Sequence, residues 1–472
     1  MENKTVATEL KEKLFANRKN GLNKVSEETL NKAMEFSEGY KEFLDLAKTE
    51  REAVAVSVKL AEEKGFKPYV IGEKHKAGDK LYINNRGKSV AFIVLGKQSV
   101  EKGVTLSAAH VDSPRLDLKP NPLYEDIELA LFKTHYYGGI RKYQWTAIPL
   151  ALHGVFVKKD GSVVNVKIGE DENDPVFCIT DILPHLAQDQ VTKKMSEANS
   201  GESLNVILGN IACDDEDIKE GVKLNVLKIL NEKYDITEED LLSSEIEIVP
   251  AFKARDVGLD RSMLGGYGQD DRVCAYASLK AITEIKKPEK TAVCLLVDKE
   301  EVGSMGATGM RSRNFENTMA KLCSMLTDNY SDLVLRETLS NSTCLSADVG
   351  ATLDPNYPEV SERRNSALLN CGILLCKYTG SRGKGGASDA SAELVAKIRR
   401  IFNENNVQWQ MGELGKVDGG GGGTIAQYVA NLDMDVIDAG TPLLSMHSPF
   451  EIAGKLDIYM TYKGYREFYL HN

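Results

Sequence analysis

The stretch TAVCLLVDKEEVGS, residues 291–304, predicts both the type of fold and the place of the functional site. Its first half is a continuous, largely apolar run, which is typical of a strand buried on both faces of a parallel sheet. Asp298, Glu300 and Glu301 follow directly, and open α/β sheets carry their sites at the carboxyl ends of their strands. Three crowded carboxylates repel one another unless cations neutralise them. A metal site is therefore the first hypothesis.

Length and composition indicate a soluble protein of two domains. The chain has 472 residues, of which 42% are hydrophobic and 27% charged, too many residues for one ordinary core. Its net charge of −11 argues against nucleic acid or an anionic membrane as a partner. No apolar run is long enough to predict a membrane span, and the first residues, MENKT, lack the basic start and apolar core expected of a signal peptide. The eight cysteines show no C-x-x-C spacing, which favours buried thiols in the reducing cytoplasm.

Helix and strand patterns alternate at both ends of the chain, as expected for an α/β fold. Residues 26–64 show helical spacing with Ser26 as N-cap, and a second helical pattern follows Asp270. Strand patterns lie at residues 80–87, 90–95, 104–109, 291–297, 341–347 and around 436. We predict a mixed, mostly parallel sheet flanked by helices.

A different pattern interrupts this arrangement. Between residues 122 and 248 the sequence consists of strand-like runs and turns, with Asp160 and Gly161 marking a hairpin. We predict that residues 118–250 form an inserted β-rich domain, and that residues 1–117 and 251–472 together build the α/β domain.

Seven ionisable side chains lie at the ends of the predicted elements: His110, Asp112, Asp270, Glu300, Glu301, Asp348 and His447. A parallel sheet brings such ends together even when they are far apart in sequence. Two imidazoles and three carboxylates match a dinuclear zinc site, and a carboxylate beside a ligand suits a general base. Taken one at a time, each residue also fits an ordinary role, such as a helix N-cap or a solvated loop. The set as a whole predicts a two-metal hydrolase.

The segment after His447 carries the pattern of a helix start. Ser448 and Glu451 have the spacing of a capping box, with Pro449 at the first helical position. We expect a helix to begin here, with His447 directly before its N-terminus.

Five motifs in this order resemble the aspartyl aminopeptidase / vacuolar aminopeptidase I family, in its prokaryotic branch. They are AAHVDSPR at 108–115, GQDDR at 268–272, DKEEVGS at 298–304, SAD at 346–348 with PNYPE at 355–359, and MHS at 446–448. The resemblance extends from the N-terminal helices to the C-terminus. It implies a dinuclear zinc exopeptidase that cleaves peptides with a free N-terminus. It also implies an inserted domain that forms a homodimer, and dimers that assemble into a homododecamer.

The resemblance also assigns roles by position. It implies that five residues bind two Zn²⁺ ions per subunit: His110, Asp270, Glu301, Asp348 and His447. Asp270 would bridge the metals, with Asp271 as a neighbour and not a ligand. Asp112 would orient the His110 imidazole, and Glu300 would be the general base. Co²⁺ or Mn²⁺ would accept the same ligands.

Four further residues are expected to contact the substrate. Lys377 matches a family lysine near the substrate side chain and suits an acidic first residue, although it also fits an exposed strand end. The family's paired histidines after Ser-Ala-Asp are absent here, so the first residue is expected to be acidic or neutral. His185 resembles a histidine that reaches the neighbouring subunit's site. Gly422 and Gly423 either line the substrate backbone or belong to a flexible loop.

Two other functions compete with this prediction. The first is another dinuclear exopeptidase, of the carboxypeptidase or deblocking type, which does not require a free N-terminal amine. The second is a non-catalytic oligomeric binding protein that keeps the fold. Intact ligands and Glu300 argue against the second.

Overall fold

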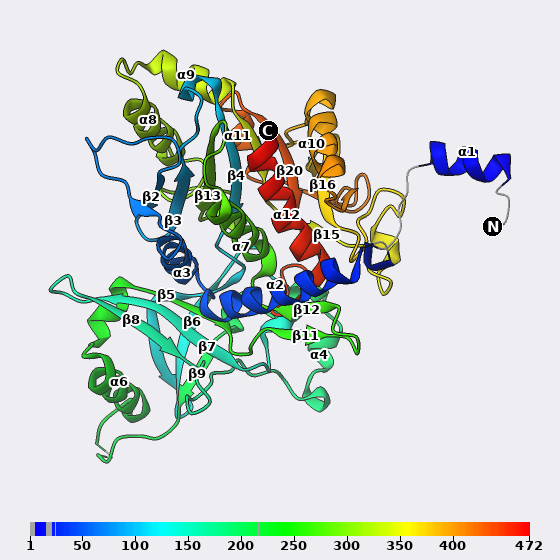
Figure 1. The fold of residues 1–472 in the computed structure, drawn as a ribbon. Coiled ribbons are helices and arrows are strands. Elements are labelled where there is room, and N and C mark those ends of the chain that lie inside the picture. Colours follow the sequence, from blue (N-terminus) through cyan, green and yellow to red (C-terminus); the bar gives the residue numbers. More distant parts are fainter. Residues whose placement is uncertain (1–4, 16–20, 24, 216) are drawn as a thin grey trace.

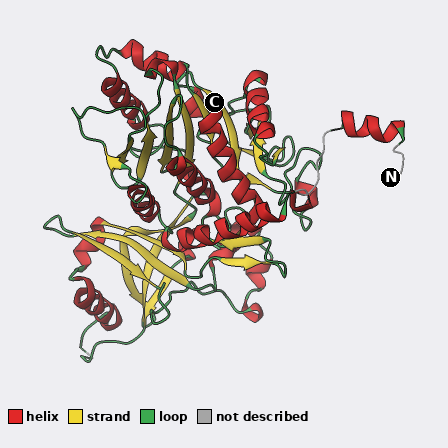
Figure 2. Ribbon diagram, in the orientation of Figure 1, coloured by secondary structure: helices red, strands yellow, loops and turns green. Residues whose placement is uncertain are grey.

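The computed structural model describes residues 5–15, 21–23, 25–215 and 217–472. A large α/β unit contains segments from both the N-terminal and the C-terminal half of the chain, and a second unit made mainly of strands packs against it (Figures 1 and 2). The helices are α1 (Val6–Leu14), α2 (Glu27–Leu46), α3 (Glu50–Glu62), α4 (Gln188–Val191), α5 (Met195–Ala198), α6 (Gly221–Tyr234), α7 (Gln269–Glu284), α8 (Asn314–Leu326), α9 (Asp332–Ser340), α10 (Ala392–Glu404), α11 (Ala426–Ala430) and α12 (Lys455–His471).

The α/β unit is built on one sheet in the order β1-β2-β3-β13-β4-β14-β20-β16-β18. Its strands are β1 (Lys67–Pro68), β2 (Lys80–Asn85), β3 (Ser89–Val94), β13 (Thr291–Val297), β4 (Val104–His110), β14 (Thr343–Ser346), β20 (Asp435–Gly440), β16 (Ile373–Cys376) and β18 (Trp409–Met411). Within the described residues, five strand pairs are parallel and three antiparallel. The predicted mixed, mostly parallel sheet is confirmed.

Strand β13 shows why this sheet is covered on both faces. Its alternate residues belong to two separate cores, so that Cys294 faces one layer of helices and Leu295 the other. Helices α2, α3, α7, α10 and α12 cover the first face, and α8, α9 and α11 cover the second. The prediction of a strand buried on both faces is confirmed, but β13 is parallel only to β4 and runs antiparallel to β3.

The second unit contains a six-stranded antiparallel sheet in the order β8-β7-β10-β5-β6-β9. The strands are β5 (Arg115–Asp126), β6 (Leu129–Tyr137), β7 (Leu150–Val157), β8 (Val163–Ile168), β9 (Val206–Gly209) and β10 (Ser244–Pro250). They enclose a hydrophobic core of their own. The hairpin predicted at Asp160 and Gly161 joins β7 to β8. This sheet occupies the predicted insertion, whose limits at 118 and 250 stay a prediction.

A small third sheet lies beside the functional residues. Its order is β11-β12-β22-β21-β15, formed by β11 (Arg255–Val257), β12 (Met263–Gly266), β22 (Glu451–Gly454), β21 (Pro442–Leu444) and β15 (Gly350–Ala351). A two-stranded pair joins β17 (Gly380–Ser381) to β19 (Gly421–Gly422). The prediction of a helix directly after His447 is wrong, because Glu451 begins strand β22, which pairs with β12 and β21. The next helix, α12, starts only at Lys455.

Candidate metal centre and active site

Asp270 lies between the two imidazoles that the sequence places far apart. His110 is the last residue of β4, Asp270 lies in the first turn of α7, and His447 lies in the turn between β21 and β22. Asp270 Oδ1 is 3.1 Å from His110 Nε2, and Asp270 Oδ2 is 3.1 Å from His447 Nε2. One carboxylate therefore presents a different oxygen to each imidazole.

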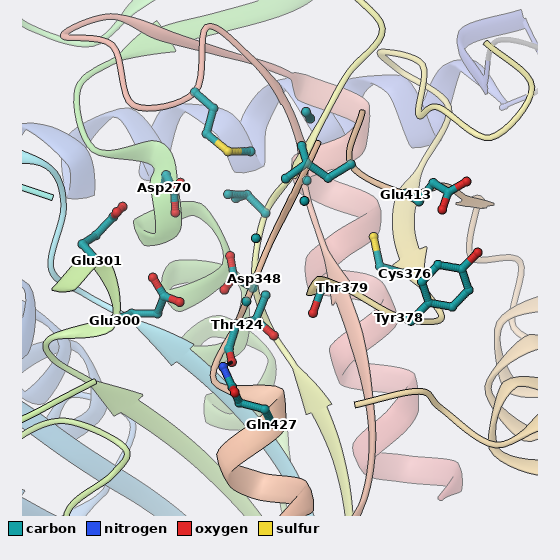
Figure 3. A pocket seen from close by; sticks show the side chains of 18 of the residues that line it. Asp270, Glu300, Glu301, Asp348, Cys376, Tyr378, Thr379, Glu413, Thr424 and Gln427 are labelled. Carbon is teal, nitrogen blue, oxygen red and sulfur yellow. Dashed lines mark hydrogen bonds between the residues drawn. The ribbon is translucent and has the colours of Figure 1, made fainter. Parts of the chain in front are cut away.

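The acidic doublet after β13 closes the same site. Glu301 Oε1 is 3.5 Å from His447 Nε2, and Glu300 Oε2 is 3.9 Å from His110 Nε2. Both side chains lie with Asp270 and Asp348 at one end of a pocket (Figure 3). Ligand atoms of His110, Asp270 and Glu301 all lie within 4.8 Å of one another. The structure thus brings together all five side chains predicted as ligands.

Asp271 also reaches this site, although the resemblance implies no ligand role for it. Its ligand atoms lie within 4.8 Å of those of His110 and Asp348. Its Oδ2 accepts a hydrogen bond from the His110 backbone at 3.3 Å, whereas its Oδ1 is buried without a hydrogen-bond partner. Residues 270 and 271 depart from helical φ/ψ at the start of α7. The resemblance places Asp270 at the first acidic position of its motif and implies that Asp271 is a neighbour and not a ligand. In this non-helical turn both carboxylates lie near His110.

Asp112 contacts more of the site than the sequence indicated. His110 Nδ1 donates to the Asp112 backbone oxygen at 3.0 Å and lies 3.4 Å from its Oδ1. The fully buried Asp112 carboxylate also accepts hydrogen bonds from the backbone amides of Glu300 and Glu301, at 3.1 and 3.2 Å. Asp112 therefore orients one imidazole and the acidic doublet together.

Glu451 has a different role from the predicted capping box. Its Oε1 accepts a hydrogen bond from the His447 amide at 2.8 Å, and its Oε2 accepts one from the Asp270 amide at 3.1 Å. The side chain is buried. A carboxylate that joins the backbones of two separate segments fixes their spacing. Sequence spacing within 447–451 gives no sign of this bond, because Asp270 lies 181 residues away.

Burial and neighbouring charges shift the titration of these groups. Burial raises the pKa of Glu300 to about 7, a value suited to taking up and releasing a proton near neutral pH. Burial also raises the pKa of Glu301 and Asp348 well above the ordinary range. Burial opposes ionisation of Asp270, but the hydrogen bonds from His110 and His447 outweigh it and lower the pKa of that carboxyl.

The donor set fits a pair of divalent cations. The His110 Nδ1 hydrogen bond to a carbonyl leaves Nε2 as the ligand nitrogen, as in other histidine metal sites. Glu301 Oε1 and Asp271 Oδ1 are buried without hydrogen-bond partners. Buried carboxylates without partners are costly unless a cation neutralises them. Imidazole nitrogens with carboxylate oxygens are the ligands typical of zinc.

A cavity of about 480 Å³ extends from these ligands across the ends of β14 and β16. Gly422 and Gly423 line it together with Gln427 and Tyr428. Gly421 and Gly422 pair with Gly380 and Ser381, so this part of the glycine run is a strand pair and not only a loop. Figure 3 shows Tyr378 and Glu413 at the end of the pocket away from Glu300 and Glu301.

Two predicted substrate contacts lie elsewhere. Lys377 is partly exposed after β16, 4.0 Å from Asp389, and is not among the described residues that line the pocket. His185 is exposed in a short 3₁₀ turn of the inserted unit. A contact of His185 with the site of a neighbouring subunit stays a prediction.

Residues 43–469 match the family described as "Aminopeptidase I zinc metalloprotease (M18)". The chain belongs to the M18 family. The resemblance inferred from five motifs is therefore confirmed, and the protein is an M18 zinc aminopeptidase. A relative from Clostridium acetobutylicum, named "Probable M18 family aminopeptidase 1", is 55% identical over 95% of this chain and 97% of its own length.

Solved structures of M18 proteins share the fold. An M18 aminopeptidase from Thermotoga maritima matches with a TM-score of 0.93 at 46% identity, covering 97% of this chain and 100% of that one. Aminopeptidase I from Clostridium acetobutylicum matches with a TM-score of 0.89 at 50% identity, with the same coverage. The S. cerevisiae mApe1 dodecamer, at 21% identity and a TM-score of 0.74 over 93% of this chain and 96% of that one, shares the fold.

The described helices of this M18 protein include none with the length and apolar character needed to cross a membrane.

Proposed function

We propose that this M18 aminopeptidase hydrolyses the first peptide bond of its substrates at a two-metal centre, with Glu300 as the general base. The observation that carries the proposal is the Asp270 carboxylate, which presents one oxygen to His110 and the other to His447. A carboxylate in this position would hold two cations, one through each oxygen. The other ligands are His110, Glu301, Asp348 and His447, and Asp271 holds the backbone of His110 through its hydrogen bond to the His110 amide.

Zinc is the metal named for the family, and two ions, when bound, supply Lewis acidity that activates water and polarises the peptide carbonyl. Co²⁺ and Mn²⁺ accept the same oxygen and nitrogen ligands.

Glu300 is the residue that moves the proton. Its side chain reaches the site from the end of β13, and its Oε2 lies 3.9 Å from the ligand nitrogen of His110. The Glu300 carboxylate takes a proton from the attacking water and returns it to the amine that leaves. Burial raises the pKa of this carboxyl to about 7, which makes it a stronger base than an exposed glutamate.

The free amine of the substrate distinguishes this function from its rivals. We expect Leu-p-nitroanilide to be hydrolysed, the N-acetylated compound to be inert, and 1,10-phenanthroline to abolish turnover until Zn²⁺ is restored. A carboxypeptidase or a deblocking enzyme would act on blocked peptides. A binding protein of the same fold would release no p-nitroaniline, and either result would contradict the proposal.

The pocket favours a neutral first residue over an acidic one. The apolar side chains of Val349, Leu374 and Leu414 line it, and the described lining contains no lysine or arginine. The Glu413 carboxylate lies close enough to Tyr378 to raise the pKa of the phenol. An acidic substrate side chain directed toward Glu413 would meet a like charge, and this repulsion would weaken the binding of acidic substrates.

We therefore expect kcat/KM for Leu-p-nitroanilide to exceed that for Asp-p-nitroanilide by about tenfold or more. Glu413→Gln should narrow this ratio, and Glu404→Gln, at an exposed site on α10, should leave it unchanged. If the wild-type enzyme hydrolyses Asp-p-nitroanilide faster than Leu-p-nitroanilide, the preference is for an acidic first residue and this prediction is contradicted.

We also propose that the chain is cytoplasmic and assembles through its inserted unit into homodimers and then into a homododecamer. The inserted unit exposes large apolar side chains, among them Ile127, Leu186, Val191 and Ile211, as expected of an interface. His185 is the neighbour of Leu186 in an exposed turn, so an interface formed by Leu186 would also include His185. Light scattering of the purified protein measures the assembly, and a stable monomer would contradict it.

A further inference from the structure

A short segment of the inserted antiparallel unit reaches the centre described above. It consists of Tyr137, the last residue of β6, with Gly138 and Gly139. All three residues contact parts of the α/β unit that hold or carry the proposed ligands. The other side chains at the centre come from the α/β unit itself.

Tyr137 acts on the acidic doublet through Asp112. Its hydroxyl donates to Asp112 Oδ2 at 2.7 Å, and the same carboxylate holds the amides of Glu300 and Glu301. The aromatic ring is fixed by cations, because the Arg115 guanidinium carbon lies 3.9 Å and the Lys299 ammonium 5.5 Å from its centroid. Only 8% of Tyr137 is exposed. The phenol is therefore a rigid donor to the carboxylate that orients the doublet.

Gly139 acts on His447. Its carbonyl oxygen lies 3.1 Å from His447 Nδ1. A carbonyl only accepts hydrogen bonds, so Nδ1 carries the proton and donates it. The other nitrogen, Nε2, is the one that faces Asp270 at 3.1 Å. A backbone oxygen of the inserted unit thereby selects the ring nitrogen that is available to a metal.

Gly138 allows the segment to approach this closely. It has a φ of +73°, and a Cβ placed there would lie 3.3 Å from Glu301 Cβ and 3.4 Å from its Oε2. A larger residue would therefore be strained in its backbone and would also press on a proposed ligand.

We propose that the Tyr137–Gly139 segment positions the metal ligands, so that metal affinity depends on the docking of the inserted unit onto the α/β unit. This inference rests on the proposed two-metal centre. It gives the inserted unit a role within its own subunit, in addition to any role in assembly. Tyr137 and Gly139 are positioning residues, since they act through Asp112 and His447.

The first test removes one hydroxyl group. In Tyr137→Phe we expect zinc affinity, measured by competition with a chromophoric chelator, to fall about 10–100-fold. We expect kcat to fall while KM changes little. Tyr136→Phe is the matched control: it changes the preceding residue, which is 44% exposed, and should behave as wild type. Unchanged zinc affinity in Tyr137→Phe would overturn the inference.

The second test separates crowding from backbone strain. Gly138→Ala and Gly161→Ala both place a side chain at positive φ, +73° and +85°, but Gly161 has no atom within 4 Å of its added Cβ. We expect both variants to lose some thermal stability and only Gly138→Ala to lose zinc. Equal zinc affinity in the two variants would contradict the inference. A wild-type protein that binds fewer than two zinc ions would instead contradict the proposed function.

Discussion

Replacement of Glu300 by glutamine is expected to lower kcat about 10²–10⁴-fold while two zinc ions remain bound. Glutamine keeps the shape of the side chain and the backbone hydrogen bond to Asp112, but its amide cannot take a proton from water. The five predicted ligands are untouched by this change. Stopped-assay kinetics and metal analysis of the purified variant measure the two quantities separately.

Glu301→Gln provides the contrast, because the neighbouring residue is proposed to bind metal. We expect it to lose zinc as well as activity, since an amide oxygen is a weaker and uncharged ligand. If Glu300→Gln stays fully active, or if it loses zinc as Glu301→Gln does, the roles of the two glutamates are assigned wrongly.

Glu451→Gln is expected to weaken zinc binding about 10–100-fold and to destabilise the fold by about 1–3 kcal/mol. Both carboxylate oxygens accept backbone amides, from His447 and from Asp270. The glutamine side chain offers one acceptor oxygen and one NH2 donor. The backbone amide of either His447 or Asp270 would therefore face a second donor and lose its acceptor. The two ligand-bearing segments would then lose their fixed spacing.

Chelator competition measures the zinc affinity of Glu451→Gln, and thermal unfolding of the metal-free protein measures its stability. Glu404→Gln serves as control, because Glu404 is exposed at the end of α10. A Glu451→Gln variant that binds zinc as tightly as wild type would show that the amide bonds do not hold the ligand spacing.

The main sheet could be predicted from sequence because its signal is local. An apolar run such as 291–297 is buried on both faces wherever it lies, and the structure divides its alternate residues between two cores. The N-cap at Ser26 is equally local, and its side chain accepts from the Thr29 amide as expected. The direction of neighbouring strands is not local, so the antiparallel pairing of β13 with β3 could not be read from the run itself.

The error at Glu451 has a clear physical cause. Ser448, Pro449 and Glu451 satisfy the spacing of a capping box, but a carboxylate bonds whichever donors the fold places beside it. Here those donors are the amides of His447 and Asp270, and the chain continues as a strand between β12 and β21. The resemblance likewise gave no sign that Asp271 lies so close to His110 and Asp348, because that proximity depends on the non-helical turn at residues 270 and 271.

The sequence by itself determined the alternation of buried strands and helices, the antiparallel character of the insertion, and which side chains end the strands. These features depend on contacts within a few residues. Only the tertiary structure decided which oxygen of Asp270 faces which imidazole, that Glu451 ties two ligand segments together, and that Tyr137 and Gly139 reach in from the inserted sheet. Most of these contacts join residues that lie at least 25 positions apart in the sequence, and the bond between Glu451 and His447 lies within a backbone turn. The geometry of such hydrogen bonds depends on how the elements pack, which the sequence pattern does not reveal.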